Sequence, residues 1–330
     1  MDLSAFIEEW NNDSERLMLH TSGSTGSPKA IWVEKSRMVA SARMTCRFLG
    51  LHRGDSALLC LPLDYIAGKM MVVRALTCGL RIVDVGSDGH PLAGLSAADG
   101  IDFAAMVPLQ VYNSLQVAVE RERLCGIRHL IIGGGAVDEA LAAELRTFPN
   151  NIWSTYGMTE TLSHVALRRL SGGDATEWYT PLPSVRVSLA ADGCLKVVAP
   201  LVCEGELTTR DLAELHPDGV RFRLLGRKDN VIVSGGLKIQ AEAVEEALRG
   251  HLDVPFMVTR CRDARLGQTV VLMTTGSTDG LAALCRRVLP AYWQPRHIVH
   301  VDRLPLTPTG KLARHEAEQL FLSLEFRIKN

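Results

Sequence analysis

"HTSGSTGSPKA" (His20–Ala30) is a stretch of hydroxyl residues and glycines that also carries a proline and a lysine. Glycine lets a backbone pass close to a ligand, and successive N–H groups in such turns bind anions. The hydroxyls add donors and Lys29 adds a cation, so phosphate is the expected ligand. The spacing is not that of a P-loop, because only two residues separate Gly23 from Gly26 and Pro28 precedes the lysine. We therefore expect the loop to lie over phosphates between two strands; a flexible polar linker is the alternative.

Short apolar runs alternate with helical patterns after this loop. The runs at 57–61, 101–107 and 127–132 read as strands, and helix-like segments follow each of them. This alternation predicts an α/β fold with a mainly parallel sheet and helices on its faces. Ligands in such sheets gather at the carboxyl ends of the strands. The loop, the glycines 133–135 and "STYGMTE" (154–160) all follow predicted strands, so we expect them to lie close together.

The pattern changes in the second half of the chain. Four short strands between 180 and 225 predict a small antiparallel subdomain. After the charged turn "GRKDN" (226–230) we expect a smaller α+β unit with strands near 231–233, 255–259 and 269–274 and helices at 241–249, 280–289 and from about 312. We place a domain boundary at Lys228–Asp229, which gives an N-terminal domain of residues 1–228 and a C-terminal domain of residues 229–330.

Composition excludes several classes of partner. The 330 residues are 47% apolar and 22% charged with a net charge of −1, so neither nucleic acid nor an anionic membrane is an expected partner. No apolar run approaches a membrane span, and the start of the chain is acidic, unlike a secretory signal. The eight cysteines form no C-x-x-C pair, which favours reduced thiols in the cytoplasm over a zinc site.

Two glycine-containing motifs carry candidate site residues. In "TYGMTE" (155–160), Tyr156 supplies an aromatic face and Glu160 a carboxylate of the kind that holds Mg²⁺ beside substrate phosphates. A solvated glutamate that caps the next helix is the alternative. In "GGGAV" (133–137), the glycines either let a flat ring approach the backbone or form an ordinary strand-to-helix turn.

Three further features lie toward the C-terminus. Asp211 follows a predicted strand and could accept both ribose hydroxyls, or be an ordinary turn residue. "GRKDNVIVSGG" (226–236) combines a basic turn, a strand and a Ser-Gly-Gly hinge. In "PLTPTGK" (305–311) two prolines stiffen the approach to a protruding Lys311; a helix start is the alternative.

Taken in order, these motifs resemble the adenylate-forming superfamily of acyl-CoA synthetases, peptide-synthetase adenylation domains and luciferases. "TSGSTGSPK" is similar to its phosphate loop, "YGMTE" to its central motif, "GRKDNVIVSGG" to its hinge motif and "PLTPTGK" to its terminal lysine motif. Within the superfamily, the stretches 106–115, 130–141 and 156–167 look most like the o-succinylbenzoate–CoA ligases of menaquinone biosynthesis.

The chain also departs from the family pattern. Relatives carry a hundred or more residues before the phosphate loop, so the first subdomain is expected to be largely missing. Tyr65 stands where many relatives have histidine, and Arg210 replaces the glycine that usually precedes the ribose aspartate. Leu207 replaces an aromatic residue, and Ala241 and Ala243 replace proline and glutamate. The Asp, Lys and Glu positions of the chemistry are kept, so we expect an active enzyme.

The resemblance implies an ATP-dependent acid–CoA ligase that works through an acyl-adenylate, with Mg²⁺ as cofactor and CoA as co-substrate. Its residues fall into four groups: catalytic Lys311, Thr159 and Glu160, the last also the metal ligand; nucleotide-binding Thr21, Ser22, Ser24, Thr25, Lys29, Gly134, Gly135, Ala136, Tyr156, Gly157, Asp211 and Arg227; acid-binding Tyr65, Lys69, Gly133, Met158, Ser163 and His164; and Asp229, Gly235 and Gly236 for the hinge and CoA.

Lys69 is the predicted partner of a second carboxylate if the acid is o-succinylbenzoate, with Ser163 and His164 as rivals and a surface lysine as the alternative. Another aryl- or acyl-CoA synthetase, an adenylation module that loads a carrier protein, and an inactive binding paralogue are the competing functions. The sequence leaves the oligomeric state open.

Overall fold

The computed structural model describes residues 1–20, 30–96, 99–306 and 312–329. The site residues predicted at 21–29 and at 311 lie outside these ranges.

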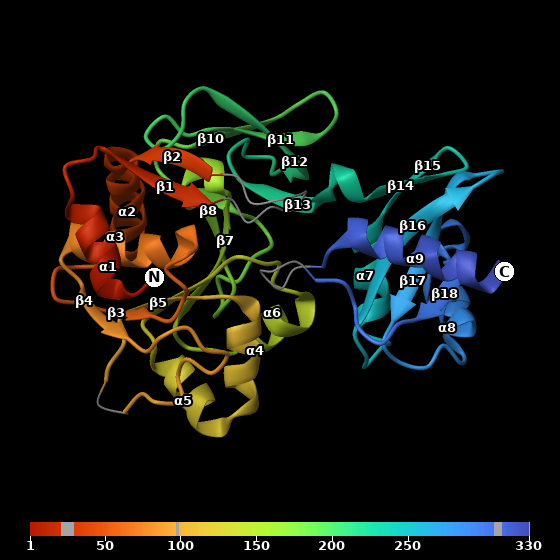
Figure 1. Cartoon of the computed structure of the whole chain (residues 1–330), viewed down its shortest axis with the longest axis horizontal. Helices are drawn as coiled ribbons and strands as arrows, with labels where there is room; N and C mark the ends of the chain where they lie inside the picture. The colour runs from red at the N-terminus through yellow and green to blue at the C-terminus, as the bar shows by residue number, and fades with distance from the viewer. Residues whose placement is uncertain (21–29, 97–98, 307–311, 330) are drawn as a thin grey trace.

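A seven-stranded sheet forms the centre of the larger part of the molecule (Figure 1). Its order is β4-β3-β5-β6-β7-β8-β9, in which the strands from β4 to β7 are parallel and the last two pairings are antiparallel. The strands are β3 (Ser56–Leu59), β4 (Arg81–Asp84), β5 (Phe103–Met106), β6 (His129–Ile132), β7 (Asn151–Gly157), β8 (His164–Arg169) and β9 (Thr180–Pro181). The predicted mainly parallel α/β fold is confirmed.

Helices cover both faces of this sheet. Alternate residues of a strand point to opposite faces; accordingly Leu59 and Phe103 pack with α2 (Lys35–Leu49) and α3 (Ile66–Cys78), whereas Leu58 and Met106 pack in a second core cluster. That second cluster includes residues of α4 (Pro108–Gln116), α5 (Ala118–Gly126) and α6 (Glu139–Leu145). Because the strands from β4 to β7 are parallel, their carboxyl ends lie along one edge of the sheet.

The N-terminal segment frames the hydroxyl-rich loop. Helix α1 (Leu3–Asn11) is capped by Asp2, and β1 (Arg16–His20) pairs antiparallel with β2 (Ala30–Glu34). The last residue of β1 is opposite the first residue of β2 in this pairing. Two paired strands therefore flank residues 21–29 in the sequence, and the predicted loop itself lies outside the described residues.

The antiparallel subdomain predicted between 180 and 225 is formed by residues 186–227, because Thr180–Pro181 (β9) belongs to the central sheet. Its four-stranded sheet has the order β10 (Arg186–Leu189), β11 (Cys194–Val198), β12 (Glu206–Leu215) and β13 (Phe222–Arg227). A single 3-10 turn, η2 (Lys228–Asn230), then leads directly into the next sheet.

The rest of the chain forms a five-stranded sheet with its own core clusters. Its elements are β14 (Val231–Ser234), β15 (Leu237–Gln240), α7 (Ala241–Arg249), β16 (Phe256–Asp263), β17 (Gly267–Thr274), α8 (Leu281–Val288), η3 (Ala291–Trp293), β18 (His297–His300) and α9 (Arg314–Lys329). Helix α7 covers the range predicted for it. Figure 1 shows this unit beside the larger part, with the start of α9 facing it.

One predicted helix is two in the structure. The segment 108–120 divides at Val117, whose backbone is extended (φ −113°, ψ 115°), into α4 and α5. A β-branched side chain favours this conformation. None of the helices among the described residues is long and apolar enough to span a membrane.

Candidate active site

The predicted glycines and the "TYGMTE" motif meet at the carboxyl edge of the central sheet. Strands β6 and β7 are parallel neighbours with Ile132 opposite Ser154, so Gly133 and the end of β7 leave the sheet side by side. The hydroxyl of Thr155 donates to the carbonyl of Ile132 at 3.2 Å, and a Cβ on Gly133 would come within 2.5 Å of that hydroxyl oxygen. The two motifs are therefore brought together as predicted.

Gly157 occupies a position that no larger residue fits. The β7–β8 pairing shifts register between Tyr156 and Gly157, which brings the next strand close. A Cβ on Gly157 would lie 2.3 Å from the carbonyl oxygen of Ser163 and 2.5 Å from the Cα of His164. Both neighbours are backbone atoms, so they cannot move aside as a flexible side chain would.

Gly157→Ala is expected to lower the free energy of unfolding by about 1–3 kcal/mol, because overpacking forces the backbone to shift. Chemical denaturation measures this change. Gly173→Ala is the matched control, since nothing lies within 4 Å of the Cβ position of Gly173. Equal stability of the two variants would contradict the tight approach of β8 to Gly157.

Thr159 and Glu160 follow in the 3-10 turn η1 (Thr159–Thr161). Glu160 is exposed at the carboxyl edge of the sheet, and the structure gives its carboxylate no ion pair with a described residue. A free carboxylate that can join substrate phosphates around one cation fits Mg²⁺, which keeps most of its oxygen ligands from water and phosphate. Among the described residues, no cluster of three or more His, Cys, Asp or Glu could hold a metal ion by itself, without phosphate oxygens as further ligands.

Tyr156 connects this edge to the four-stranded sheet. Its hydroxyl donates to Oδ2 of Asp211 at 2.7 Å, and its ring packs edge-on against Phe222 and Tyr179. Burial, and next the charge of Asp211, raise the pKa of Tyr156, so the phenol stays a donor at neutral pH. The ring and the carboxylate predicted for adenine and ribose are thus held together.

Asp211 and Arg227 lie opposite each other on β12 and β13. Nε of Arg227 is 3.9 Å from Oδ1 of Asp211, and its Nη2 is 3.5 Å from Oδ2 of Asp229. The predicted ribose pair therefore contacts the predicted hinge residue. Arg210 completes this group with Nη1 at 2.6 Å from Oδ1 of Asp229.

Two predicted acid-binding residues lie at the start of α3. Tyr65 precedes the helix and is exposed. Lys69 is only 4% exposed; its ammonium is 3.6 Å from a carboxylate oxygen of Glu9 and 5.2 Å from the ring centre of Phe6. The alternative of a surface lysine is wrong, because α1 packs over this part of α3. The role of Lys69 toward the acid stays a prediction.

Ser163 and His164 surround a residue that the sequence reasoning missed. Arg74 is 2% exposed, and its guanidinium donates to Oγ of Ser163 at 2.6 Å and to the sulfur of Met71 at 3.7 Å. Among the described residues, its Nε has no hydrogen-bond partner and no carboxylate pairs with the side chain. Burial lowers the pKa of Arg74 to about 10, so the group is still charged at neutral pH.

The surroundings of Arg74 are neutral. Nε2 of His164 lies 3.0 Å from the hydroxyl of Thr45, and its Nδ1 lies 3.4 Å from Oγ of Ser163. Burial, followed by the charge of Arg74, lowers the pKa of His164 well below its usual value, so the imidazole is uncharged. An arginine in an otherwise apolar helix, "MMVVRALTC" (70–78), was the only signal in the sequence.

Gly235 and Gly236 are not brought to this edge. They form the turn between β14 and β15 with positive φ values of 57° and 84°, and the N–H of Gly235 donates to Leu266 in the same unit. A cavity of about 300 Å³ lies beside this turn, lined in part by Tyr292, Gln294 and Arg296. In Figure 1 the β14–β15 hairpin lies away from β7.

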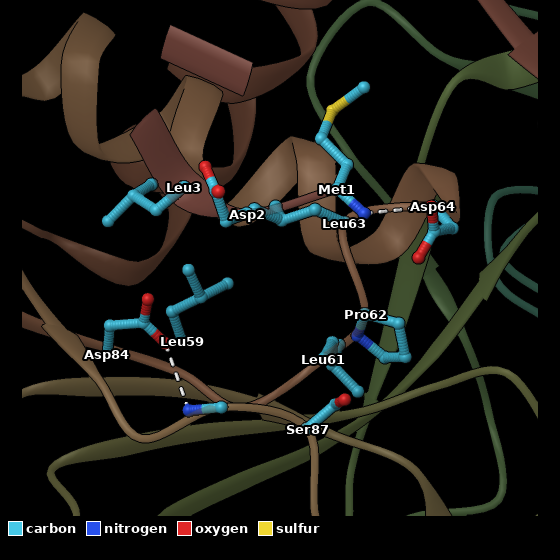
Figure 2. A pocket seen from close by; sticks show the side chains of 11 residues that line it. Met1, Asp2, Leu3, Leu59, Leu61, Pro62, Leu63, Asp64, Asp84 and Ser87 are labelled. Atoms are coloured by element: carbon cyan, nitrogen blue, oxygen red, sulfur yellow. Dashed lines mark hydrogen bonds and ion pairs between the residues drawn. The ribbon is translucent and has the colours of Figure 1, made fainter. Parts of the chain in front are cut away.

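A second cavity of about 250 Å³ lies between the N-terminus and the ends of β3 and β4 (Figure 2). Leu59 and Leu61 form part of its lining, and Asp64 there pairs with the N-terminal ammonium at 3.3 Å. None of the described site residues that the sequence predicts lines this cavity, but it lies at the carboxyl ends of β3 and β4, and Asp64 in its lining directly precedes the predicted acid-binding residue Tyr65.

The comparison with protein families decides the class. The model of the AMP-binding enzyme family matches residues 5–212, which is more than half of the chain. The chain belongs to the AMP-binding enzyme family. With its ligase relatives, this membership makes it an AMP-forming acyl-CoA synthetase.

The relatives of this AMP-binding enzyme include the 2-succinylbenzoate–CoA ligase of Bacillus mycoides (strain KBAB4), with 26% identity over 96% of this chain and 72% of the relative. An acyl-CoA synthetase (AMP-forming)/AMP-acid ligase II-like protein from Dyadobacter fermentans is 35% identical, with a TM-score of 0.65 over 96% of this chain and 92% of its own. The o-succinylbenzoate coenzyme A synthetase of Bacillus subtilis, solved with ATP and magnesium ion, shares the fold at 24% identity and a TM-score of 0.73, over 91% of this chain and 69% of its own.

Proposed function

We propose that this AMP-binding enzyme joins o-succinylbenzoate to CoA, with release of AMP and pyrophosphate, as a step of menaquinone biosynthesis. The names of the curated relatives support this substrate. The observation that carries it is the buried Arg74, a cation with no carboxylate partner among the described residues.

o-Succinylbenzoate has two carboxylates, and only one of them is activated. The other must be bound by a group that compensates its charge once it leaves water. Arg74 carries such a charge, and Ser163 beside it is a second donor. Pairing of a buried guanidinium with a carboxylate satisfies both groups, whereas Lys69 already has Glu9. We therefore assign the second carboxylate to Arg74, with Tyr65, Gly133 and Met158 as further acid-pocket residues.

The first step of the proposed reaction is attack of the acid carboxylate on the α-phosphorus of ATP. It brings two anions together, so it needs cations and donors at the α-phosphate. We assign this role to Lys311 and Thr159, and the β- and γ-phosphates to the loop residues Thr21, Ser22, Ser24, Thr25 and Lys29. Mg²⁺ held by Glu160 would supply further positive charge beside the phosphates.

The nucleotide is proposed to lie across the edge formed by β6 and β7. Adenine would pack between the turn of Gly134, Gly135 and Ala136 and the segment of Tyr156 and Gly157. The ribose hydroxyls would bind Asp211 and Arg227. The hydrogen bond from Tyr156 fixes the Asp211 carboxylate, so the ring and the ribose ligand move as one piece.

The second step is displacement of AMP by the CoA thiol. We propose that residues 229–330 form a mobile domain that turns about Asp229, withdraws Lys311 and brings Gly235 and Gly236 to the thiol. The present position of the β14–β15 hairpin, away from β7, supports the need for such a movement (Figure 1).

The test is acid-dependent pyrophosphate release from ATP, followed by detection of the thioester after addition of CoA. o-Succinylbenzoate is expected to give both products, and 4-oxo-4-phenylbutanoate, which lacks the ring carboxylate, to react much more weakly. Equal activity with both acids would contradict the substrate assignment. Transfer to a carrier protein but not to free CoA would favour an adenylation module, and absence of pyrophosphate release with any acid would favour an inactive paralogue.

A further inference from the structure

Two ion pairs tie the hinge segment to the four-stranded sheet. Nζ of Lys228 lies 2.6 Å from Oδ2 of Asp192 in the β10–β11 turn, and Nη1 of Arg210 lies 2.6 Å from Oδ1 of Asp229. The hydrogen bond from Lys228 holds the pKa of Asp192 at about 2, so that carboxylate is ionised at neutral pH. Lys228 and Asp229, two of the three residues of the turn that leads to β14, are therefore held by ion pairs.

Arg210 occupies the position before Asp211 at which the adenylate-forming superfamily usually has glycine. A glycine cannot reach Asp229, so among the described residues the Asp229 carboxylate would then keep only its longer contact of 3.5 Å with Arg227. The side chain of Arg210 is 67% exposed, so it is not held there by burial. Among the described residues, Asp229 is the hydrogen-bond partner that the structure gives this side chain.

The charges around Arg210 alternate in sign. Asp211, Arg227, Asp229 and Arg210 form a chain with contacts of 3.9, 3.5 and 2.6 Å. Asp211 and Arg227 are the proposed ribose ligands, and Asp229 is the proposed hinge. Arg210 is thus the last member of a group that connects the nucleotide site to the hinge.

Arg210, Asp229, Arg227 and Asp211 hold the C-terminal unit in the orientation that fits one of the two proposed half-reactions. The start of α9 at Arg314, three positions after Lys311 in the sequence, faces the larger part of the molecule, and the β14–β15 hairpin does not (Figure 1). Under the proposed function this is the arrangement for adenylate formation, and thioester formation requires the C-terminal unit to turn at Lys228–Asn230.

We propose that Arg210 is a positioning residue that holds Asp229 and so favours the adenylate-forming arrangement over the thioester-forming one. This inference rests on the proposed function. The Arg210–Asp229 pair is exposed, so its free energy is small. If the pair forms in only one of the two arrangements, it changes the ratio of their populations by a factor that corresponds to that free energy, here about twofold to fivefold.

The experiment measures the two half-reactions separately for the wild-type chain, Arg210→Gly and Arg210→Met. The first is pyrophosphate release driven by o-succinylbenzoate, and the second is thioester formation from supplied acyl-adenylate and CoA. Both variants are expected to lower the ratio of the first rate to the second about twofold to fivefold. About 0.5 M salt should bring the wild-type ratio toward that of the variants, because salt screens an exposed pair.

Arg223→Met is the matched control. Arg223 pairs with Glu214 at 2.7 Å on the same sheet with no contact to the hinge turn, so its loss should leave the ratio unchanged. If Arg210→Met changes neither rate, or lowers both equally, the inference is wrong while the proposed function stands. If the wild-type chain catalyses neither half-reaction, the proposed function is wrong and the inference falls with it.

Discussion

Lys311→Ala is expected to lower acid-dependent pyrophosphate release by about 10²–10³-fold, the usual effect of removing one preorganised electrostatic contact. The ammonium is useful where charge develops in the first transition state, and it has little use once AMP is bonded to the acyl group. The same variant should therefore still convert supplied acyl-adenylate and CoA to the thioester. Rates of the two half-reactions measure this difference.

The fold is not expected to change in this variant. Both ends of the segment that carries Lys311 are held by other residues: Leu306 forms a β-bridge with Leu312, and the N–H of Ala313 donates to Pro305 at 2.9 Å. Arg314 then forms a hydrogen-bonded ion pair with Glu245, with Nη2 2.7 Å from Oε2. Lys196→Ala, in the four-stranded sheet, is the control. Near-normal pyrophosphate release, or equal loss of both half-reactions in a folded protein, would show that the assigned role is wrong.

Arg74→Met is expected to raise KM for o-succinylbenzoate by about 30-fold or more, because loss of one member of a buried charge pair costs about 2–5 kcal/mol. KM for ATP should stay unchanged, since the nucleotide is proposed to bind along β6, β7 and β12. Steady-state kinetics with each substrate varied in turn measure both constants. With 4-oxo-4-phenylbutanoate the variant should match the wild type, because that acid has no second carboxylate to bind.

Stability distinguishes a binding role from a structural one. An apolar side chain of similar length in place of a buried charge without a counter-charge is often neutral or stabilising, so the midpoint of thermal unfolding should not fall. A lower midpoint with an unchanged KM would make Arg74 a structural residue. Lys69→Met tests the competing assignment: a larger rise in KM there than at Arg74 would place the second carboxylate at Lys69.

The sequence predicted those parts of the fold in which chemistry and pattern agree. Pro28 and the glycine spacing indicated a stretch between two strands, and β1 and β2 are the strands that flank it in the sequence. The capping of α6 by Asp138, which accepts from the N–H of Leu141 at 2.8 Å, also follows from local preferences. The meeting of the 133–135 turn with the end of β7 follows from the parallel pairing of two consecutive strands.

The acid-binding region could not be predicted in the same way. Every residue of α3 from Gly68 to Ala75 is buried, so the helix has no polar face to indicate which side chains point inward. Lys69 and Arg74 were equivalent in the sequence, as two cations in an apolar helix. Only packing separates them, because α1 brings Glu9 to Lys69, whereas the turn before β8 brings a neutral serine to Arg74.

The hydrophobic clusters of the described residues have a consequence for how the protein denatures. Two of them contain only residues before Asn230 and two contain only residues after it. Apolar burial is the main source of cooperativity, so the two parts should lose their structure in separate transitions. Trp10, Trp32, Trp153 and Trp178 lie in the first part and Trp293 in the second. Tryptophan fluorescence therefore follows mainly the unfolding of the first part, and calorimetry should resolve the melting of the second.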